Sequence, residues 1–259
     1  MKERAAVSGS HGFIGEALVS KLKETHDVYR LSRGEEFINA KKIFDLAAFG
    51  NISHQKDPRA IYQANVLRLV SLLESTKAQD YDCFVVTSSL AVNLPVKTFY
   101  SESKIAAEKV AQKYAEEYDK PIVIIRPASV YGPYDYSGHL IPKIIKSCRT
   151  GEKMPFVPHP HHDFIFIDDF IDAVLKVSDN AKDCRGHVFE IGTGISYSNK
   201  EILETIESLM GKQANIEYVD SMRSFDTDRW IANTWDIRAL GWEPKYTLKE
   251  GLRRTIYES

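Results

Sequence analysis

Apolar and polar positions along the chain follow two patterns, short apolar runs and longer stretches with apolar residues three or four apart. The apolar runs predict strands, because strands buried on both faces of a parallel sheet are nearly continuous in Val, Ile, Leu and Phe. They occupy residues 5–7, 28–31, 42–46, 83–87, 122–126 and 164–167. The other spacing predicts amphipathic helices, above all over 58–77 and 101–118. Strands that alternate with helices predict a doubly wound parallel sheet of the α/β class.

The pattern changes after about residue 130. Pro and Gly become frequent, as in YGPYDYSG and GEKMPFVPHPHHD, and isolated strands at 187–191 and 215–219 stand between short helices. This change predicts a smaller lobe beside the carboxyl ends of the strands. We therefore expect residues 1–130, with about 160–192, in the sheet domain, and residues 131–159 and 193–259 in the smaller lobe.

Composition argues against several classes of protein. The 259 residues carry 34 Lys and Arg against 36 Asp and Glu, so the charge balance predicts neither nucleic acid nor a membrane as partner. The sequence has neither an apolar run long enough to span a bilayer nor an apolar signal segment, and we expect a cytoplasmic protein. Cys83, Cys148 and Cys184 are widely spaced, which predicts buried thiols rather than disulfides or a thiolate metal site.

The first predicted strand runs into a glycine-rich turn, V-S-G-S-H-G-F-I-G, with Gly9, Gly12 and Gly15 spaced three apart. Glycines let the backbone approach a pyrophosphate, and the helix that follows offers N–H donors at its amino end. A turn without a ligand is the alternative, but the position between a strand and an amphipathic helix favours a dinucleotide. The remaining cofactor contacts expected in this loop are His11, Phe13 and Ile14.

Tyr100 and Lys104 stand four residues apart in YSESK, a spacing that many exposed helices share. With F-V-V-T-S-S-L-A-V-N at 84–93 and the G-x-x-G-x-x-G spacing, however, it resembles the extended short-chain dehydrogenase/reductases, in the nucleotide-sugar epimerase/dehydratase family. The resemblance makes Ser89, Tyr100 and Lys104 the catalytic residues. A phenol with a pKa of about 10 needs a nearby ammonium to act as a base at neutral pH, and Lys104 is placed to provide it.

The resemblance covers nearly the whole chain and implies a Rossmann fold with a smaller, substrate-binding C-terminal lobe. D-L-A-A at 45–48 resembles the family's H-L-A-A segment beside the cofactor, and IIRPASVYGP at 124–133 resembles its turn beside the nicotinamide. The implied cofactor contacts are Leu46, Ala47, Ala48, Tyr100, Lys104, Pro127 and Val130. The implied substrate contacts are Ser89, Leu90, Ser129, His162 and Arg223. The family also implies a homodimer formed through the helices at 58–77 and 101–118.

Ser32 and Arg33, at the end of the second predicted strand, favour NADP(H) over NAD(H). They stand where the family usually has an acidic residue that holds the ribose of NAD. A hydroxyl and a guanidinium can bind a 2′-phosphate, whereas a carboxylate would repel it. The alternatives are NAD(H) as cofactor, and an Arg33 that is solvated or stacked on adenine.

Other departures from the family concern the substrate and a metal. Ser129 replaces an Asn that often contacts the sugar nucleotide, and His162 replaces an Arg that often binds its diphosphate. Between Leu31 and Lys42 there is no room for the strand and helix that usually hold adenine. The run H-P-H-H-D at 159–163 could ligate a metal, but neighbouring side chains of an extended loop point in different directions, so we expect none.

The catalytic residues predict an NAD(P)-dependent oxidoreductase, and we expect a ketoreductase of a nucleotide-linked keto sugar. A nucleotide-sugar 4-epimerase with retained NAD uses the same three residues and is the alternative. A 4,6-dehydratase is less similar, because Leu90 and Ala91 stand where that group needs an acid and a base. A non-enzymatic NADP-binding sensor is the third interpretation, although such relatives commonly lose the tyrosine or the lysine.

Overall fold

A six-stranded parallel sheet forms the centre of the computed structural model, which describes residues 2–32, 34–35, 39–52, 54–135, 138–220 and 230–258. Its strands are β1 (Arg4–Ser8), β2 (Asp27–Leu31), β3 (Lys42–Asp45), β4 (Cys83–Thr87), β5 (Ile122–Pro127) and β9 (Val188–Ile191). They lie in the order β2-β1-β3-β4-β5-β9, and every neighbouring pair is parallel. The predicted doubly wound α/β fold is confirmed.

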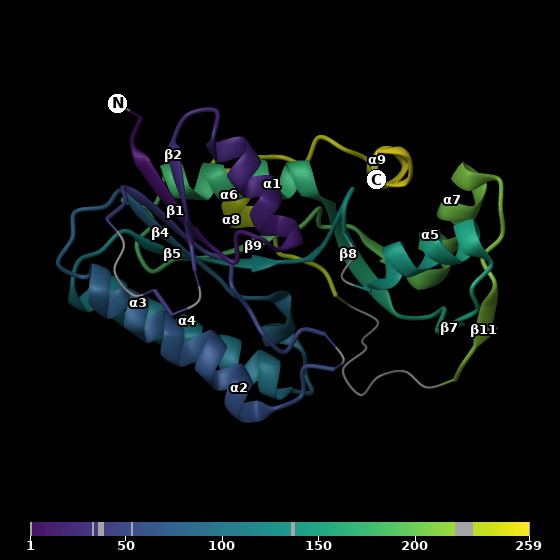
Figure 1. Cartoon of the computed structure of the whole chain (residues 1–259), viewed down its shortest axis with the longest axis horizontal. Coiled ribbons are helices and arrows are strands. Elements are labelled where there is room, and N and C mark those ends of the chain that lie inside the picture. Colours follow the sequence, from purple (N-terminus) through teal and green to yellow (C-terminus); the bar gives the residue numbers. More distant parts are fainter. Residues whose placement is uncertain are drawn as a thin grey trace.

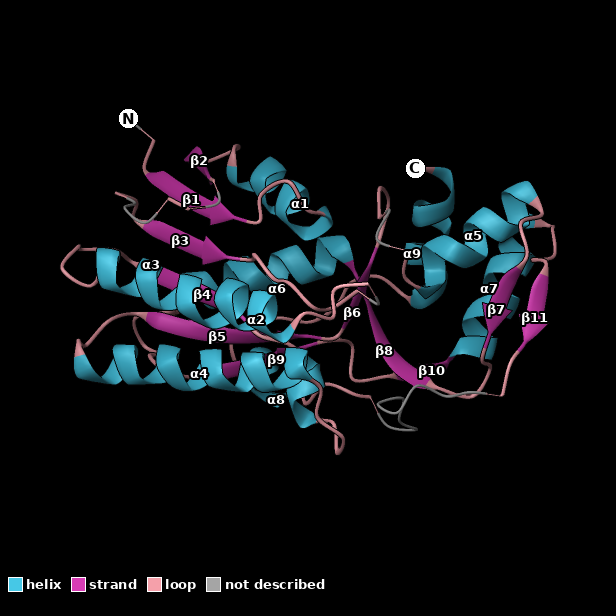
Figure 2. Cartoon of the chain, turned by 60° about the horizontal axis from the view of Figure 1, so that its bottom comes forward, coloured by secondary structure: helices cyan, strands magenta, loops and turns pink. Residues whose placement is uncertain are grey.

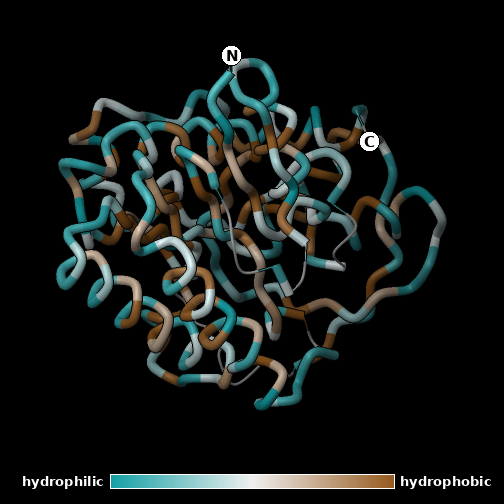
Figure 3. The backbone as a smooth tube through the Cα atoms, turned by 60° about the vertical axis from the view of Figure 1, so that its left-hand side comes forward, coloured by the Kyte–Doolittle hydropathy of each residue, from teal (hydrophilic) through white to brown (hydrophobic). Residues whose placement is uncertain are grey.

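Helices cover both faces of this sheet (Figure 1). One face packs on α1 (Phe13–Leu22) and α6 (Ile167–Asp179), and the other on α3 (Arg68–Thr76) and α4 (Phe99–Glu117). Adjacent residues of one strand enter opposite cores: Val85 packs with the first helix pair and Phe84 with the second. The strands are therefore continuous apolar runs, because both of their faces are buried. Apolar positions accordingly gather in the interior of the molecule, as the hydropathy colours in Figure 3 show.

The predicted helix over 58–77 is a series of three joined segments. α2 (Pro58–Tyr62) begins at Asp57, whose side chain caps it, and continues through a π-helical segment, η1 (Gln63–Leu67), into α3. α4 begins at a capping box in which Thr98 and Ser101 bond each other's backbone, which agrees with the predicted helix over 101–118. These caps explain where both helices start.

The predicted strand at 164–167 was wrongly assigned to the central sheet. It lies in β8 (His161–Phe166), which pairs with β6 (Ser129–Tyr131) and β10 (Ser196–Ser198) in a separate three-stranded sheet. The sixth central strand is β9, which pairs with β5. An apolar run shows that a strand is buried, but it carries no information about which strand lies beside it.

The short connection between β2 and β3 shapes the edge of the sheet. Among the described residues between them, 32, 34–35 and 39–41, there is neither helix nor strand. β3 pairs with β1 on the side opposite to β2. The chain therefore adds β2 on one side of β1 and then crosses over to add β3 on the other side. In open α/β sheets such a reversal creates a crevice at the carboxyl end of the strand, which is where ligands bind.

Most of the remaining elements lie beyond the carboxyl ends of the central strands (Figure 2). They include α5 (Leu140–Thr150), β7 (Met154–Phe156), α7 (Asn199–Met210), β11 (Ile216–Tyr218) and α9 (Leu248–Tyr257). In contrast, α8 (Trp235–Ala239), which falls within the proposed lobe, packs against β9 of the central sheet.

Cys83 and Cys148 are buried as predicted, whereas Cys184 is partly exposed. Within the described residues, none of the helices is long and apolar enough to cross a membrane.

Candidate active site

The glycine loop follows β1 at this crevice. Gly9 has a φ of +64°, and a Cβ there would lie 2.9 Å from the backbone nitrogen of Ala47. A Cβ on Gly15 would lie 2.1 Å from the carbonyl oxygen of Gly9. Both positions therefore require glycine, the first for its conformation and both for close backbone approach. The loop consequently lies against the 46–47 segment, which places two predicted cofactor-binding segments side by side.

The residues around this loop fit a phosphate-bearing dinucleotide. The Ser10 side chain is buried, and its Oγ has no hydrogen-bond partner within the described part of the chain. Thr87, at the carboxyl end of β4, has a buried Oγ1 that likewise has no hydrogen-bond partner within the described residues. Unpaired buried hydroxyls are uncommon in proteins, and a bound polar group would satisfy them. The amino end of α1 adds N–H donors that favour an anion.

Ser89, Tyr100 and Lys104 meet at the carboxyl end of β4. The Ser89 hydroxyl lies close enough to the Tyr100 phenol to lower its pKa. The Lys104 Nζ lies 5.9 Å from the centroid of the Tyr100 ring and donates to the carbonyl oxygen of Thr87 at 2.8 Å. Ser89 is held by its own turn, since its Oγ accepts from the Ala91 nitrogen at 3.1 Å and caps the 3₁₀ helix η2 (Leu90–Asn93).

Burial sets the protonation of these groups. It raises the pKa of Tyr100 to about 12, although the nearby Ser89 hydroxyl lowers it. Burial also lowers the pKa of Lys104 to about 8. The role of Lys104 in making Tyr100 a stronger acid stays a prediction, because in this structure its ammonium donates to Thr87 and lies 5.9 Å from the centroid of the Tyr100 ring. At neutral pH Tyr100 therefore holds its proton, and Lys104 is mostly charged.

Asp45 and Arg68 form a buried ion pair next to the 46–47 segment. The sequence predicts Asp45 only as part of the D-L-A-A segment. Arg68 of α3 donates from Nη1 to the Asp45 Oδ1 at 2.6 Å, and Ser8 donates to the same oxygen. The Ser8 Oγ in turn accepts from the Ala47 nitrogen at 3.2 Å. This chain of bonds joins the end of β1, the end of β3 and the start of α3, so it fixes the 46–47 segment.

Other predicted site residues are spread over neighbouring elements. Pro127 ends β5, and Ser129 and Val130 lie on β6. The turn after β6 reaches the glycine loop, since a Cβ on Gly132 would lie 3.4 Å from the Phe13 Cζ. Leu90, a predicted substrate contact, is 4% exposed and packs in the core.

Of the four residues predicted to recognise phosphates, two lie on other elements and two lie outside the described chain. Ser32 is exposed after β2, where its backbone nitrogen donates to the Glu35 carboxylate at 2.6 Å. His162 lies on β8 with its ring centroid 5.5 Å from that of Trp230. Arg33 and Arg223 lie outside the described residues.

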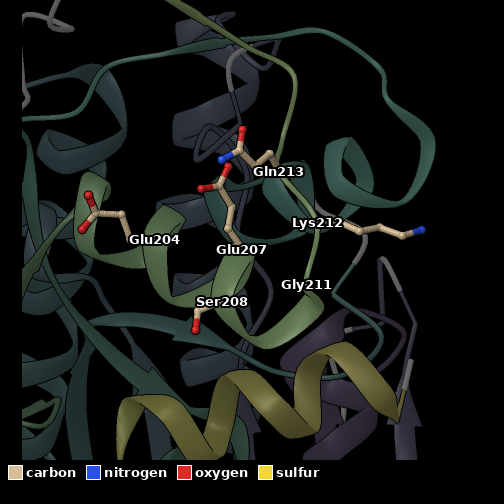
Figure 4. A pocket seen from close by; sticks show the side chains of 6 residues that line it. All are labelled: Glu204, Glu207, Ser208, Gly211, Lys212 and Gln213. Atoms are coloured by element: carbon tan, nitrogen blue, oxygen red, sulfur yellow. The ribbon is translucent and has the colours of Figure 1, made fainter.

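Two surface hollows lie away from the catalytic residues. One, of about 340 Å³, is on the carboxyl end of α7, where the side chains of Glu204 and Lys212 point apart (Figure 4). The other, of about 550 Å³, lies between the 193–195 loop and α8. Within the described chain there is no group of three or more His, Cys, Asp or Glu side chains placed to hold a metal, including in the histidine-rich run.

Comparison with known proteins assigns the chain to a family. Residues 5–192 match the NAD dependent epimerase/dehydratase family, and the chain belongs to it. CDP-abequose synthase of Salmonella typhimurium (strain LT2) is 27% identical over 300 aligned positions, which cover 99% of this chain and 98% of that protein. Low-salt glycan biosynthesis protein Agl12 of Haloferax volcanii is 31% identical over 163 residues, which are 61% of this chain but only 51% of that protein.

Solved structures share the fold. MoeE5, in complex with UDP-glucuronic acid and NAD, has a TM-score of 0.88 at 24% identity and covers 98% of this chain and 97% of its own. RMD from Pseudomonas aeruginosa, complexed with NADPH, has a TM-score of 0.84 at 20% identity and covers 98% of both chains. The family is one of nicotinamide-dependent enzymes. The solved structures that share the fold include complexes with NAD and with NADPH.

Proposed function

We propose that this chain is an NADP(H)-dependent ketoreductase that acts on a nucleotide-linked keto sugar. The observation that carries this proposal is the arrangement of Ser89, Tyr100 and Lys104 at the carboxyl end of β4, where burial raises the pKa of Tyr100 to about 12 and so keeps its phenol protonated at neutral pH. A protonated phenol is a proton donor, and reduction of a ketone needs a donor at the carbonyl oxygen.

The chain's own residues have distinct roles in this reaction. Ser89 and Tyr100 hydrogen-bond the carbonyl oxygen of the substrate, which holds it in place and stabilises the charge that develops there. Tyr100 transfers its proton to that oxygen as the alcohol forms. Lys104 then stabilises the phenolate with its positive charge, and its bond to Thr87 keeps it in place. The bound nicotinamide supplies the hydride.

The cofactor would lie across the glycine loop and the 46–48 segment, with its pyrophosphate at the amino end of α1. Preference for NADP(H) rests on Ser32 and Arg33, since neither can repel a 2′-phosphate as an acidic side chain would. NAD(H) is the alternative.

The proposals for the substrate and for a homodimeric partner rest on one relative and on the remaining parts of the chain. CDP-abequose synthase matches this chain over nearly its whole length, which supports a CDP-linked sugar among the substrates to test. Residues 131–159 and 193–259 form the proposed substrate-binding lobe, where His162 of the neighbouring β8 and Arg223 would meet the diphosphate. Leu67 and Phe99, which are 61% and 58% exposed, support the predicted homodimer through α2, α3 and α4.

The test is a reduction assay with the purified protein. CDP-, dTDP-, UDP- and GDP-linked 4-keto-6-deoxy sugars are each mixed with NADPH or NADH, and absorbance at the nicotinamide band is followed. We expect cofactor oxidation with at least one sugar, faster with NADPH. Mass spectrometry of ligand released on denaturation is the control: retained NAD, together with interconversion of 4-epimers without net oxidation, would show an epimerase instead.

A further inference from the structure

A buried network of charged side chains lies behind the catalytic residues and centres on Glu108 of α4, which is 4% exposed. Ser88 donates from Oγ to the Glu108 Oε1 at 2.5 Å. Arg126 of β5 donates from Nε to Oε1 at 2.8 Å and from Nη2 to Oε2 at 2.7 Å. Three hydrogen bonds, two of them from one guanidinium, therefore fix the Glu108 carboxylate in a single orientation.

The network reaches both ends of the turn that carries Ser89. Ser88 precedes the catalytic serine, and Asn93 ends the 3₁₀ helix that follows it. The Arg126 Nη1 donates to the Asn93 Oδ1 at 3.3 Å and to the Glu190 Oε1 at 3.2 Å, and the Asn93 Nδ2 donates to the same Glu190 oxygen at 2.6 Å. A displacement of the Glu108–Arg126 pair would consequently move both anchors of Ser89.

Glu108 also acts on Lys104. Tyr100, Lys104 and Glu108 are successive fourth residues of α4, so they follow one side of the helix. The carboxylate favours the charged form of Lys104 and opposes the burial that lowers its pKa to about 8. The other charged groups that act on Lys104 are Asp45 of β3, which favours the ammonium, and Arg68 of α3, which disfavours it.

We infer that Glu108 is a positioning residue of the active site, which anchors the Ser89 turn through Ser88 and places negative charge beside the Lys104 ammonium. The inference rests on the proposed function only in assuming that Ser89, Tyr100 and Lys104 carry out the chemistry. The competing explanation is that Glu108 and Arg126 form an ion pair that merely stabilises the fold.

The first test measures Lys104 directly and needs no substrate. Glu108→Gln keeps the size of the side chain and an acceptor for Ser88 but removes the charge. The titration midpoint of the Lys104 Nζ, followed by NMR of the ¹⁵N-lysine-labelled protein, should move from about 8 to lower pH by about half to one pH unit. Lys104→Arg identifies the signal. Glu117→Gln, at the exposed end of α4, should leave the midpoint unchanged.

Arg126→Met provides a change of opposite sign. It removes the positive charge that partly neutralises Glu108, so the Lys104 midpoint should move to higher pH. Loss of packing alone cannot produce shifts in opposite directions from the two members of one ion pair. A Lys104 midpoint that stays at the wild-type value in either folded variant would overturn the electrostatic role, whatever substrate the enzyme proves to use.

Ser88→Ala tests the anchoring role, because it removes one hydrogen bond and leaves every charge in place. In protein labelled with ¹³C at the tyrosine Cζ, the Tyr100 signal reports the surroundings of its hydroxyl, which include Ser89, and Tyr100→Phe identifies that signal. We expect Ser88→Ala to move the signal in the same direction as Ser89→Ala does, and Ser88→Thr to restore it. A Ser88→Ala spectrum identical to that of the wild type would overturn the anchoring role.

Discussion

Replacing Lys104 with Met tests whether this lysine is a buried cation with a lowered pKa. Lys104 is 3% exposed, and its pKa is about 8 instead of the ordinary 10.5 because burial penalises the ammonium. Between these two values the unfolded chain binds a proton that the folded protein does not. The free energy of unfolding of the wild type should therefore rise with pH in this window, and Met, which has no proton to bind, should abolish that part of the rise.

The size of the effect follows from the two values. At about 1.4 kcal/mol per pH unit, a fall from 10.5 to about 8 means that the buried ammonium costs about 3 kcal/mol at neutral pH. About 1 kcal/mol of this cost should disappear between pH 7 and pH 9, and the remainder by about pH 11. The stability difference between Lys104→Met and the wild type should shift by these amounts, whatever constant contribution the methyl thioether makes through packing.

The assay is urea unfolding of both proteins at pH 7, 8 and 9, followed by circular dichroism. Lys109→Met is the matched control, because Lys109 is exposed on the same helix, and its difference from the wild type should not vary with pH. If the Lys104→Met difference is equally constant, Lys104 does not carry a lowered pKa. If the wild type instead loses stability relative to the variant as the pH rises, the pKa is raised and the burial argument is wrong.

Three further predictions concern turnover and specificity. Tyr100→Phe should lower kcat by about 10² to 10⁴ with little change in cofactor affinity, measured by nicotinamide fluorescence, because it removes only the transferred proton; a variant that keeps most of its turnover would exclude Tyr100 from the mechanism. Arg33→Ala should weaken NADPH about ten- to a hundredfold and NADH hardly at all, and Ser32→Asp should invert the preference; a parallel loss for both cofactors would instead indicate stacking on adenine. His162→Ala and Arg223→Ala should raise KM for a nucleotide-linked substrate more than they lower kcat; equal turnover of simple ketones, unchanged by both variants, would contradict the nucleotide-sugar proposal.

Much of the fold and the candidate catalytic residues could be predicted from local sequence. Apolar runs at 83–87 and 122–126 are strands because both of their faces are buried, and this burial leaves its pattern in the sequence itself. Gly9 and Gly15 are explained by backbone conformation and close approach, which only glycine permits. The spacing in YSESK likewise places Tyr100 and Lys104 on one side of a helix, because helical periodicity is a local property.

Only the tertiary structure decided which elements meet. The strand at 161–166 pairs with β6 and β10 rather than with the central sheet, because strand pairing depends on chain segments far apart in sequence. The same is true of Glu108, whose partners Ser88 and Arg126 are 20 and 18 residues away. The protonation of Tyr100 was decided there too: its neighbours in sequence suggest a phenolate, but burial in the folded protein raises its pKa to about 12. Burial and charge pairing depend on contacts between residues that are distant in sequence, so they cannot be read from the order of residues along the chain.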